Sequence, residues 1–87
     1  MFAKLFGEGD DQIVCILTQT EEGEHCIDIT FDPKVEGMGL TSVKPTYGDD
    51  DHGRAVAQTE FNKLTEETVK PIIDKMREGI RKDFGTT

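Results

Sequence analysis

Long apolar runs are missing from this sequence. No stretch approaches the roughly 18 consecutive apolar residues that a membrane-spanning helix needs. The opening residues, MFAKLFG, are too few for a signal peptide and lack its basic n-region and cleavage site. We therefore expect a soluble, cytoplasmic protein that has no membrane partner.

Residues that form catalytic motifs are also scarce. Ser42 is the sole serine. A phosphate-binding loop requires glycines directly before a helix, whereas Gly7-Glu8-Gly9 and Gly37-Met38-Gly39 both precede predicted strands. A nucleophilic cysteine needs a histidine beside it. Cys15 lies in an apolar run, which raises the pKa of a thiol, and strand alternation points His25 and Cys26 to opposite faces. We expect no enzymatic activity and no cofactor.

The segment 49–53, Asp-Asp-Asp-His-Gly, comes nearest to a metal-binding loop. A calcium loop needs oxygen ligands at its positions 1, 3 and 5 and glycine at position 6. Counting from Asp49 puts Gly53 at position 5 and Arg54 at position 6, whereas counting from Gly48 removes the first ligand. Paired zinc-ligand spacings are also absent. We expect no metal site, and we interpret one aspartate as a helix N-cap, which leaves two carboxylates in surplus.

What the sequence has in excess is acid. The chain of 87 residues carries a net charge of −8. Residues 1–51 contain three lysines and twelve acidic residues, a net −9, whereas residues 52–87 contain seven basic and six acidic residues. Such a field repels nucleic acids and favours basic protein surfaces. The basic residues near the end alternate with acids and lack stacking aromatics, so direct nucleic-acid binding is not expected.

The first half of the sequence predicts β-strands. The candidates are Phe2–Phe6, Gln12–Gln19, His25–Phe31 and Leu40–Tyr47. The second candidate is apolar at both odd and even positions, as a strand covered on both faces would be. Pro45 lacks a backbone donor and indicates an edge strand or a bulge for the fourth candidate.

A two-residue turn at Glu22-Gly23 is predicted between the second and third strands. This turn pairs Thr18 with Ile27, and it sets the composition of both sheet faces. The predicted core face carries Val14, Ile16, Ile27, Ile29 and Phe31. The other face mixes Ile13, Cys15 and Leu17 with Asp28, Thr30 and Asp32. Cys15 and Cys26 lie about 13 Å apart on this mixed face, too far for a disulfide, so both are expected to be free thiols.

From Asp51 onward the apolar period changes from two to about 3.6, which predicts two helices. The first has an apolar stripe at Gly53, Ala57, Phe61 and Leu64. The second has a stripe at Val69, Ile72, Ile73, Met76, Ile80 and Phe84, with Arg77 among the residues left for solvent. Either Thr65 or Thr68 could cap the second helix. The sequence thus predicts one α+β domain over residues 1–87, an antiparallel meander of three to four strands followed by two helices on one face, with a disordered tail at 85–87.

These features favour a non-enzymatic module that binds a basic protein surface, in the way a nucleic-acid mimic would, and acts as a regulator or inhibitor. The candidate contact residues are Leu17, Glu21, Glu22, Glu24, Asp28, Asp49, Asp50 and Asp51. The alternative is a homodimer or a small subunit of a larger assembly, joined through Ile13, Cys15, Leu17 and a free strand edge. A metal-dependent or enzymatic role is a lesser alternative.

Overall fold

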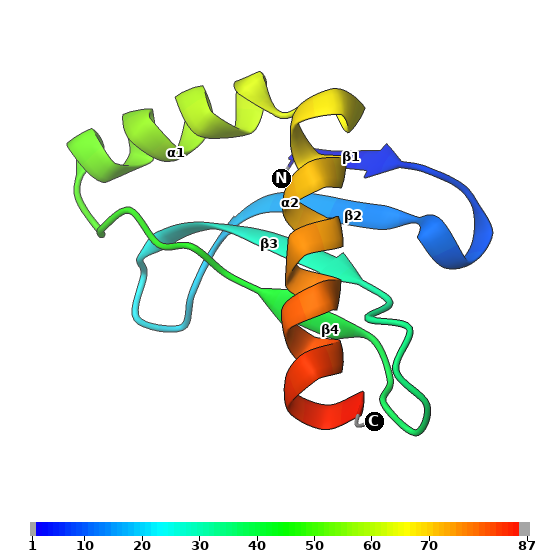
Figure 1. Cartoon of the computed structure of the whole chain (residues 1–87). Coiled ribbons are helices and arrows are strands. Elements are labelled where there is room, and N and C mark those ends of the chain that lie inside the picture. Colours follow the sequence, from blue (N-terminus) through cyan, green and yellow to red (C-terminus); the bar gives the residue numbers. More distant parts are fainter. Residues whose placement is uncertain (1, 86–87) are drawn as a thin grey trace.

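The structure is a computed structural model that describes residues 2–85, with side chains through residue 83. Four strands come first: β1 (Phe2–Phe6), β2 (Ile13–Gln19), β3 (His25–Phe31) and β4 (Thr41–Val43). The helices follow, α1 (Asp51–Lys63) and α2 (Glu66–Ile80). Two short helical segments are also present: η1 (Gly9–Asp11) between β1 and β2, and η2 (Arg81–Gly85) directly after α2. The predicted α+β arrangement, strands first and helices second, is confirmed (Figure 1).

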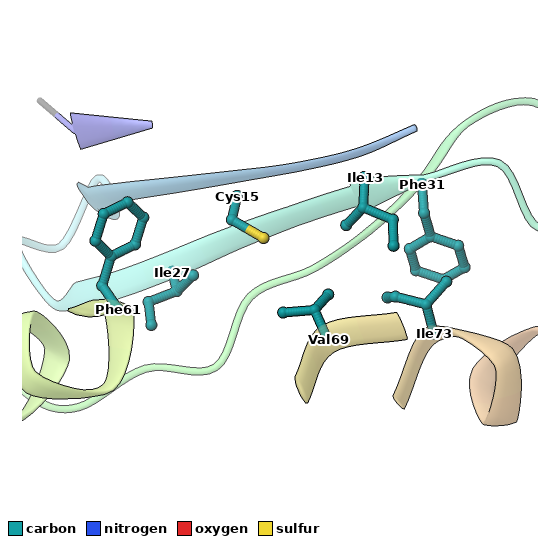
Figure 2. Close-up of a cluster of buried hydrophobic side chains, with 7 residues drawn as sticks. All are labelled: Ile13, Cys15, Ile27, Phe31, Phe61, Val69 and Ile73. Carbon is teal, nitrogen blue, oxygen red and sulfur yellow. The ribbon is translucent and has the colours of Figure 1, made fainter. Parts of the chain in front are cut away.

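The strands form one antiparallel sheet in the order β1-β2-β3-β4. Both helices pack on the same face, which we call the helix-covered face, and the opposite face is called the open face (Figure 2). β4 is shorter than the predicted Leu40–Tyr47 because the chain reaches Pro45, which cannot donate to a ladder. Thr46 then returns to form an isolated bridge with Cys26.

The register between β2 and β3 differs by one residue from the predicted one. Gln19 pairs with His25, so the connection has five residues and is not the two-residue turn predicted at Glu22-Gly23. Thr20 closes this connection twice: its N–H donates to the carbonyl of Glu24 at 2.9 Å, and its Oγ1 accepts from the N–H of Glu24 at 3.1 Å. The side chain of one threonine thus stabilises the longer loop.

This slip exchanges the two faces of β2. The helix-covered face carries Ile13, Cys15, Leu17, Ile27, Ile29 and Phe31. Val14 and Ile16, predicted for the core, lie on the open face instead. Cys15 and Cys26 therefore lie on opposite faces, not on one mixed face. Both are free, as predicted.

The core lies between the helix-covered face and the two helices, as Figure 2 shows. Its buried members are Ile13, Cys15, Ile27, Phe31, Phe61, Val69 and Ile73. Burying an aliphatic or aromatic side chain of this kind contributes roughly 1.5–3 kcal/mol. The predicted stripe of α1 is largely confirmed, because Gly53, Ala57 and Phe61 are its buried residues. The helices therefore stabilise the sheet on one side only.

Lys4 connects β1 to the end of α1. Its Nζ donates to the carbonyl oxygens of Phe61 at 2.7 Å, Leu64 at 3.0 Å and Asn62 at 3.3 Å. The last carbonyls of a helix have no partner within the helix and carry the negative end of its dipole. A cation supplied by the sheet thus caps α1 at its C-terminus.

Thr65 is the N-cap of α2, one of the two alternatives that the sequence left open. Its Oγ1 accepts from the N–H of Thr68 at 3.2 Å, and the Oγ1 of Thr68 accepts from the N–H of Thr65 at 2.9 Å. Such a reciprocal pair is a capping box. Pro71 consequently lies inside the helix and not in its first turn.

The buried stripe of α2 differs from the prediction at two positions. Arg77, assigned to solvent, is only 8% exposed, whereas Ile72, assigned to the stripe, is 49% exposed. Val69, Ile73 and Arg77 are four residues apart and share the buried side of the helix. The Nε of Arg77 donates to the carbonyl of Asp32 at 2.7 Å, which gives the buried guanidinium a partner.

Within residues 2–85, no helix has both the length and the apolarity to cross a membrane. Gly85, predicted to begin a disordered tail, is the last residue of η2. The other predicted tail residues, 86–87, lie outside the described part of the chain. The side chain of Phe84, predicted for the apolar stripe of α2, lies outside it as well.

Candidate functional site

The connection between β2 and β3 carries the first group of predicted contact residues. Glu21 and Glu22 are exposed at its tip, and Glu24 is half-buried just before β3. Gly23 has a φ of +86°, in the left-handed region that glycine adopts without a steric penalty. Its N–H donates to the carbonyl of Thr20 at 2.9 Å, so the loop places three carboxylates on a hydrogen-bonded turn.

The second predicted group, Asp49–Asp51, starts α1. Asp50 is the N-cap, because its Oδ1 accepts from the N–H of Gly53 at 2.8 Å. Gly53 is required here, since a Cβ at this position would lie 2.2 Å from the carbonyl oxygen of Tyr47. The other two aspartates are exposed. One carboxylate therefore caps the helix, and two are left facing solvent.

Backbone hydrogen bonds hold both acidic groups at one end of the molecule. The N–H of His25 donates to the carbonyl of Gly48 at 2.8 Å, and the N–H of Tyr47 donates to the carbonyl of His25 at 2.9 Å. Figure 1 shows the β2–β3 loop and the start of α1 on the same side. We call this region the acidic end; it consists of Glu21, Glu22, Glu24, Asp49, Asp50 and Asp51.

A groove of about 530 Å³ lies at the acidic end, between α1 and the ends of the strands. Its lining consists of Phe2, Leu17, Thr18, Gln19, His25, Asp51, Arg54 and Gln58. Leu17 was predicted to share a mixed sheet face with Asp28. It lies instead on the helix-covered face and lines this groove, because the register is slipped by one residue. The prediction that grouped Leu17 with Asp28 is therefore wrong.

Asp28 lies on the open face of β3. Its Oδ1 accepts from the Oγ1 of Thr30 at 3.1 Å, and its Oδ2 lies 3.8 Å from the Nζ of Lys44. A hollow of about 280 Å³ connects this position to the β2–β3 loop. Its lining consists of Thr18, Gln19, Thr20, Glu21, Glu22, Cys26, Asp28 and Lys44. The structure thus brings Asp28 to the same hollow as Glu21 and Glu22.

The open face is apolar over β1 and β2. Leu5 pairs with Val14 and Ala3 pairs with Ile16, and paired residues of antiparallel strands lie on the same face. We call these four residues the apolar half. Leu5 is 63% exposed, although sheet faces turned to water are commonly polar. This apolar area beside the acidic hollow is suited to contact with another molecule.

The two thiols are not activated nucleophiles. Cys15 is 0% exposed beneath the helices, and Cys26 is 1% exposed among side chains of the open face. Burial raises the pKa of both thiols above the ordinary value of 9.0. A thiol in such surroundings stays protonated and reacts slowly.

A polar cluster that the sequence did not predict joins three segments away from the acidic end. The Nζ of Lys34 contacts the Oδ1 of Asp11, and the Nη1 of Arg77 lies 3.9 Å from the same oxygen. The hydrogen bond from Lys34, together with its charge, lowers the pKa of Asp11. The only trace of this cluster in the sequence is that Arg77 follows Ile73 by four residues along the apolar stripe.

No three histidine, cysteine, aspartate or glutamate side chains within residues 2–85 are arranged to hold a metal ion. Comparisons of the chain with family models, with curated proteins and with solved structures find no match. Three surfaces are candidates for contact with another molecule: the acidic end, the hollow at Asp28 and the apolar half.

Proposed function

We propose that the protein is a small, non-enzymatic binding module that engages a basic surface of a protein partner and regulates or inhibits that partner. One observation supports this most directly. The carboxylates of Glu21, Glu22 and Asp28 border a single hollow of the open face, next to the apolar half. Apolar contact supplies affinity, and the carboxylates supply steering and orientation.

The charge distribution supports the same kind of partner. Residues 1–51, which include all four strands, have a net charge of −9. A field of this sign accelerates encounters with a basic surface and slows encounters with another acidic one. If the partner is a protein that binds nucleic acid, the carboxylates take positions that phosphates otherwise occupy. The charge distribution thus supports a basic protein as the partner.

Self-association, or a place as a small subunit of a larger assembly, is the alternative function. Its predicted contacts at Ile13, Cys15 and Leu17 lie on the helix-covered face, so association would have to use the apolar half or the free strand edge. Two copies that each carry −8 repel each other, which favours the basic partner. A cytoplasmic location also belongs to this proposal, because the fold of residues 2–85 contains no disulfide that would need an oxidising compartment.

Two charge-matched triple variants test the proposal. In the first, Glu21, Glu22 and Glu24 become glutamine; in the second, Glu36, Glu67 and Glu78 do, away from the acidic end. Each variant and the wild type are used for affinity capture from a lysate of the native host at low and high salt. We expect a stoichiometric basic partner that high salt releases. The first triple should weaken its binding about tenfold, from the loss of three ion pairs with the partner of roughly 0.5 kcal/mol each.

The second triple changes the net charge equally and should leave binding nearly unchanged. Equal weakening by both triples would show that total charge, and not the acidic end, attracts the partner. Light scattering of the purified protein accompanies the capture. A partner-free dimer that is indifferent to salt would contradict the proposal and support the alternative.

A further inference from the structure

The two edges of the sheet are protected to different degrees. β4 has three residues, Thr41–Val43, and Lys44-Pro45 follows directly. Short length, lysine and proline are the usual devices that keep an edge strand from pairing with another chain. β1 has five residues, Phe2–Phe6, contains no proline, and pairs with β2 alone among the described residues. β1 is therefore the edge that remains open to a further strand.

Lys4, the one charged residue of β1, does not guard this edge. A lysine that points inward can prevent pairing, because an added strand would strip its ammonium of water. Here the Nζ of Lys4 already has partners in the carbonyl oxygens at the end of α1, the nearest at 2.7 Å. A strand laid along β1 leaves these hydrogen bonds intact, so this protection is missing.

Side chains on both faces of β1 offer contacts to an added strand. Leu5 is 63% exposed on the open face, where it pairs with Val14. Phe2 is 59% exposed on the helix-covered face and lines the groove that also contains Leu17 and Arg54. In strand addition, backbone hydrogen bonds give affinity and alternating side chains give specificity. The side chains on one face of the added strand would contact Leu5, and those on its other face would contact Phe2.

Acidic side chains near β1 outnumber the exposed Arg54 of the groove and favour a basic occupant. Glu8 and Asp10 are exposed in the loop that follows β1, and Asp51 lines the groove beside Phe2. A second copy of the chain paired antiparallel to β1 would bring its own Glu8 loop toward the end marked by Asp51. Like charges would then meet at both ends of the added strand, which disfavours a second copy.

We propose that β1 receives an extended segment of the partner as a fifth strand, and that this segment has apolar alternating residues between basic flanks. The inference depends on the proposed function, because it specifies how the basic partner attaches. It places the contact along the outer edge of β1, with Leu5 and Phe2 as the side chains that the segment touches.

Synthetic peptides provide the probe. The isotope-labelled protein is titrated with KKVTVTVKK and, as a control of similar charge, with the proline-interrupted KKVTPTVKK, and amide shifts and hydrogen exchange are followed by NMR. We expect saturable shifts in β1 and β2 and slowed amide exchange in β1 with the first peptide. The proline peptide should bind about tenfold more weakly, because proline removes a donor and breaks the strand.

A matched pair of edge variants localises the contact. Leu5→Lys and Ser42→Lys add the same charge at exposed positions of β1 and β4. Leu5→Lys should weaken binding of KKVTVTVKK about fivefold or more, and Ser42→Lys should leave it unchanged. Equal effects of the two variants would overturn the inference. So would shifts confined to the residues around Asp28, or a dimer that protects the β1 amides without peptide.

The outcomes also separate this inference from the proposed function. If both peptides bind equally and the triple glutamine variant at the acidic end weakens them alike, strand addition is wrong and charge-driven binding stands. If neither peptide binds and the same triple variant leaves capture unchanged, both proposals are wrong.

Discussion

The two faces of the sheet come from the same strands, yet they differ in what covers them. On the helix-covered face, Ile13, Ile27 and Phe31 are at most 3% exposed. On the open face, Leu5 is 63% exposed, and Val14 and Ile16 are half-buried. Apolar area that stays in water adds nothing to folding stability. One face therefore stabilises the fold, and the other remains available for contact.

Each face also carries one lysine and one cysteine in the strands or directly beside them, which allows matched comparisons. Lys4 faces the helices and binds the end of α1, whereas Lys44 faces the open side and lies 3.8 Å from Asp28. Cys15 is 0% exposed on the helix-covered face, and Cys26 is 1% exposed on the open face. Each residue type thus lies beneath the helices on one face and outside them on the other.

The largest expected difference between the faces concerns apolar side chains. Phe31→Ala should lower the free energy of unfolding by about 3–5 kcal/mol, because it leaves a cavity in the core. Ile16→Ala on the open face should lower it by about 1 kcal/mol, because only part of that side chain is shielded. Urea unfolding of both variants measures the two losses. Similar losses would mean that another molecule, or a second copy, covers the open face in solution.

The lysine pair should show a smaller difference. Lys4→Met should cost about 1–2 kcal/mol, because the last carbonyls of α1 lose a charged donor. Lys44→Met should change the unfolding free energy by no more than about 0.5 kcal/mol, as expected for an exposed ion pair. Urea unfolding at low and high salt compares them. A loss at Lys4 that salt abolished would contradict the capping role, since a partly buried hydrogen bond is weakly screened.

The order and type of the elements could be predicted because they depend on local periodicity. Phe2–Phe6 and His25–Phe31 match the predicted strands residue for residue, and α1 begins at the predicted Asp51. The register could not be predicted, because Gln12–Gln19 is apolar at both odd and even positions. Burial alone therefore accepts either face of β2 as the core. The observed register goes with the longer loop, which the Oγ1 of Thr20 closes by accepting from the N–H of Glu24.

The difference between local patterns and contacts of distant segments also explains which parts of the candidate site could be predicted. The carboxylates at Glu21, Glu22 and Asp50 follow from loop and cap chemistry, which is local. The place of Leu17 depends on the register, and it was wrong for that reason. Arg77 was assigned to solvent by its charge, although a long side chain can bury its stem and place its guanidinium against a carbonyl. Contacts between distant segments decide such cases.

The thiols provide the most sensitive comparison of the two faces, because they report opening without a substitution. Cys26 should be alkylated by iodoacetamide about tenfold faster than Cys15, since small movements of the open face expose it. Cys15 should react only when the helices separate from the sheet. Mass spectrometry of the two modified peptides over time measures both rates. Equal rates would show that the two faces open together.

The pH dependence adds a second measurement on the same thiols. Burial raises the pKa of Cys15 and Cys26 above 9.0, so the folded protein keeps its thiols protonated at a pH where the unfolded chain begins to ionise. Ionisation then favours the unfolded chain, and stability should fall as the pH rises above 9.0. Cys15→Ala and Cys26→Ala should each remove part of this decline. If the removed part is larger for Cys15, the helix-covered face is the better shielded; if it is equal, the neighbouring side chains of the open face exclude water as well as a helix does.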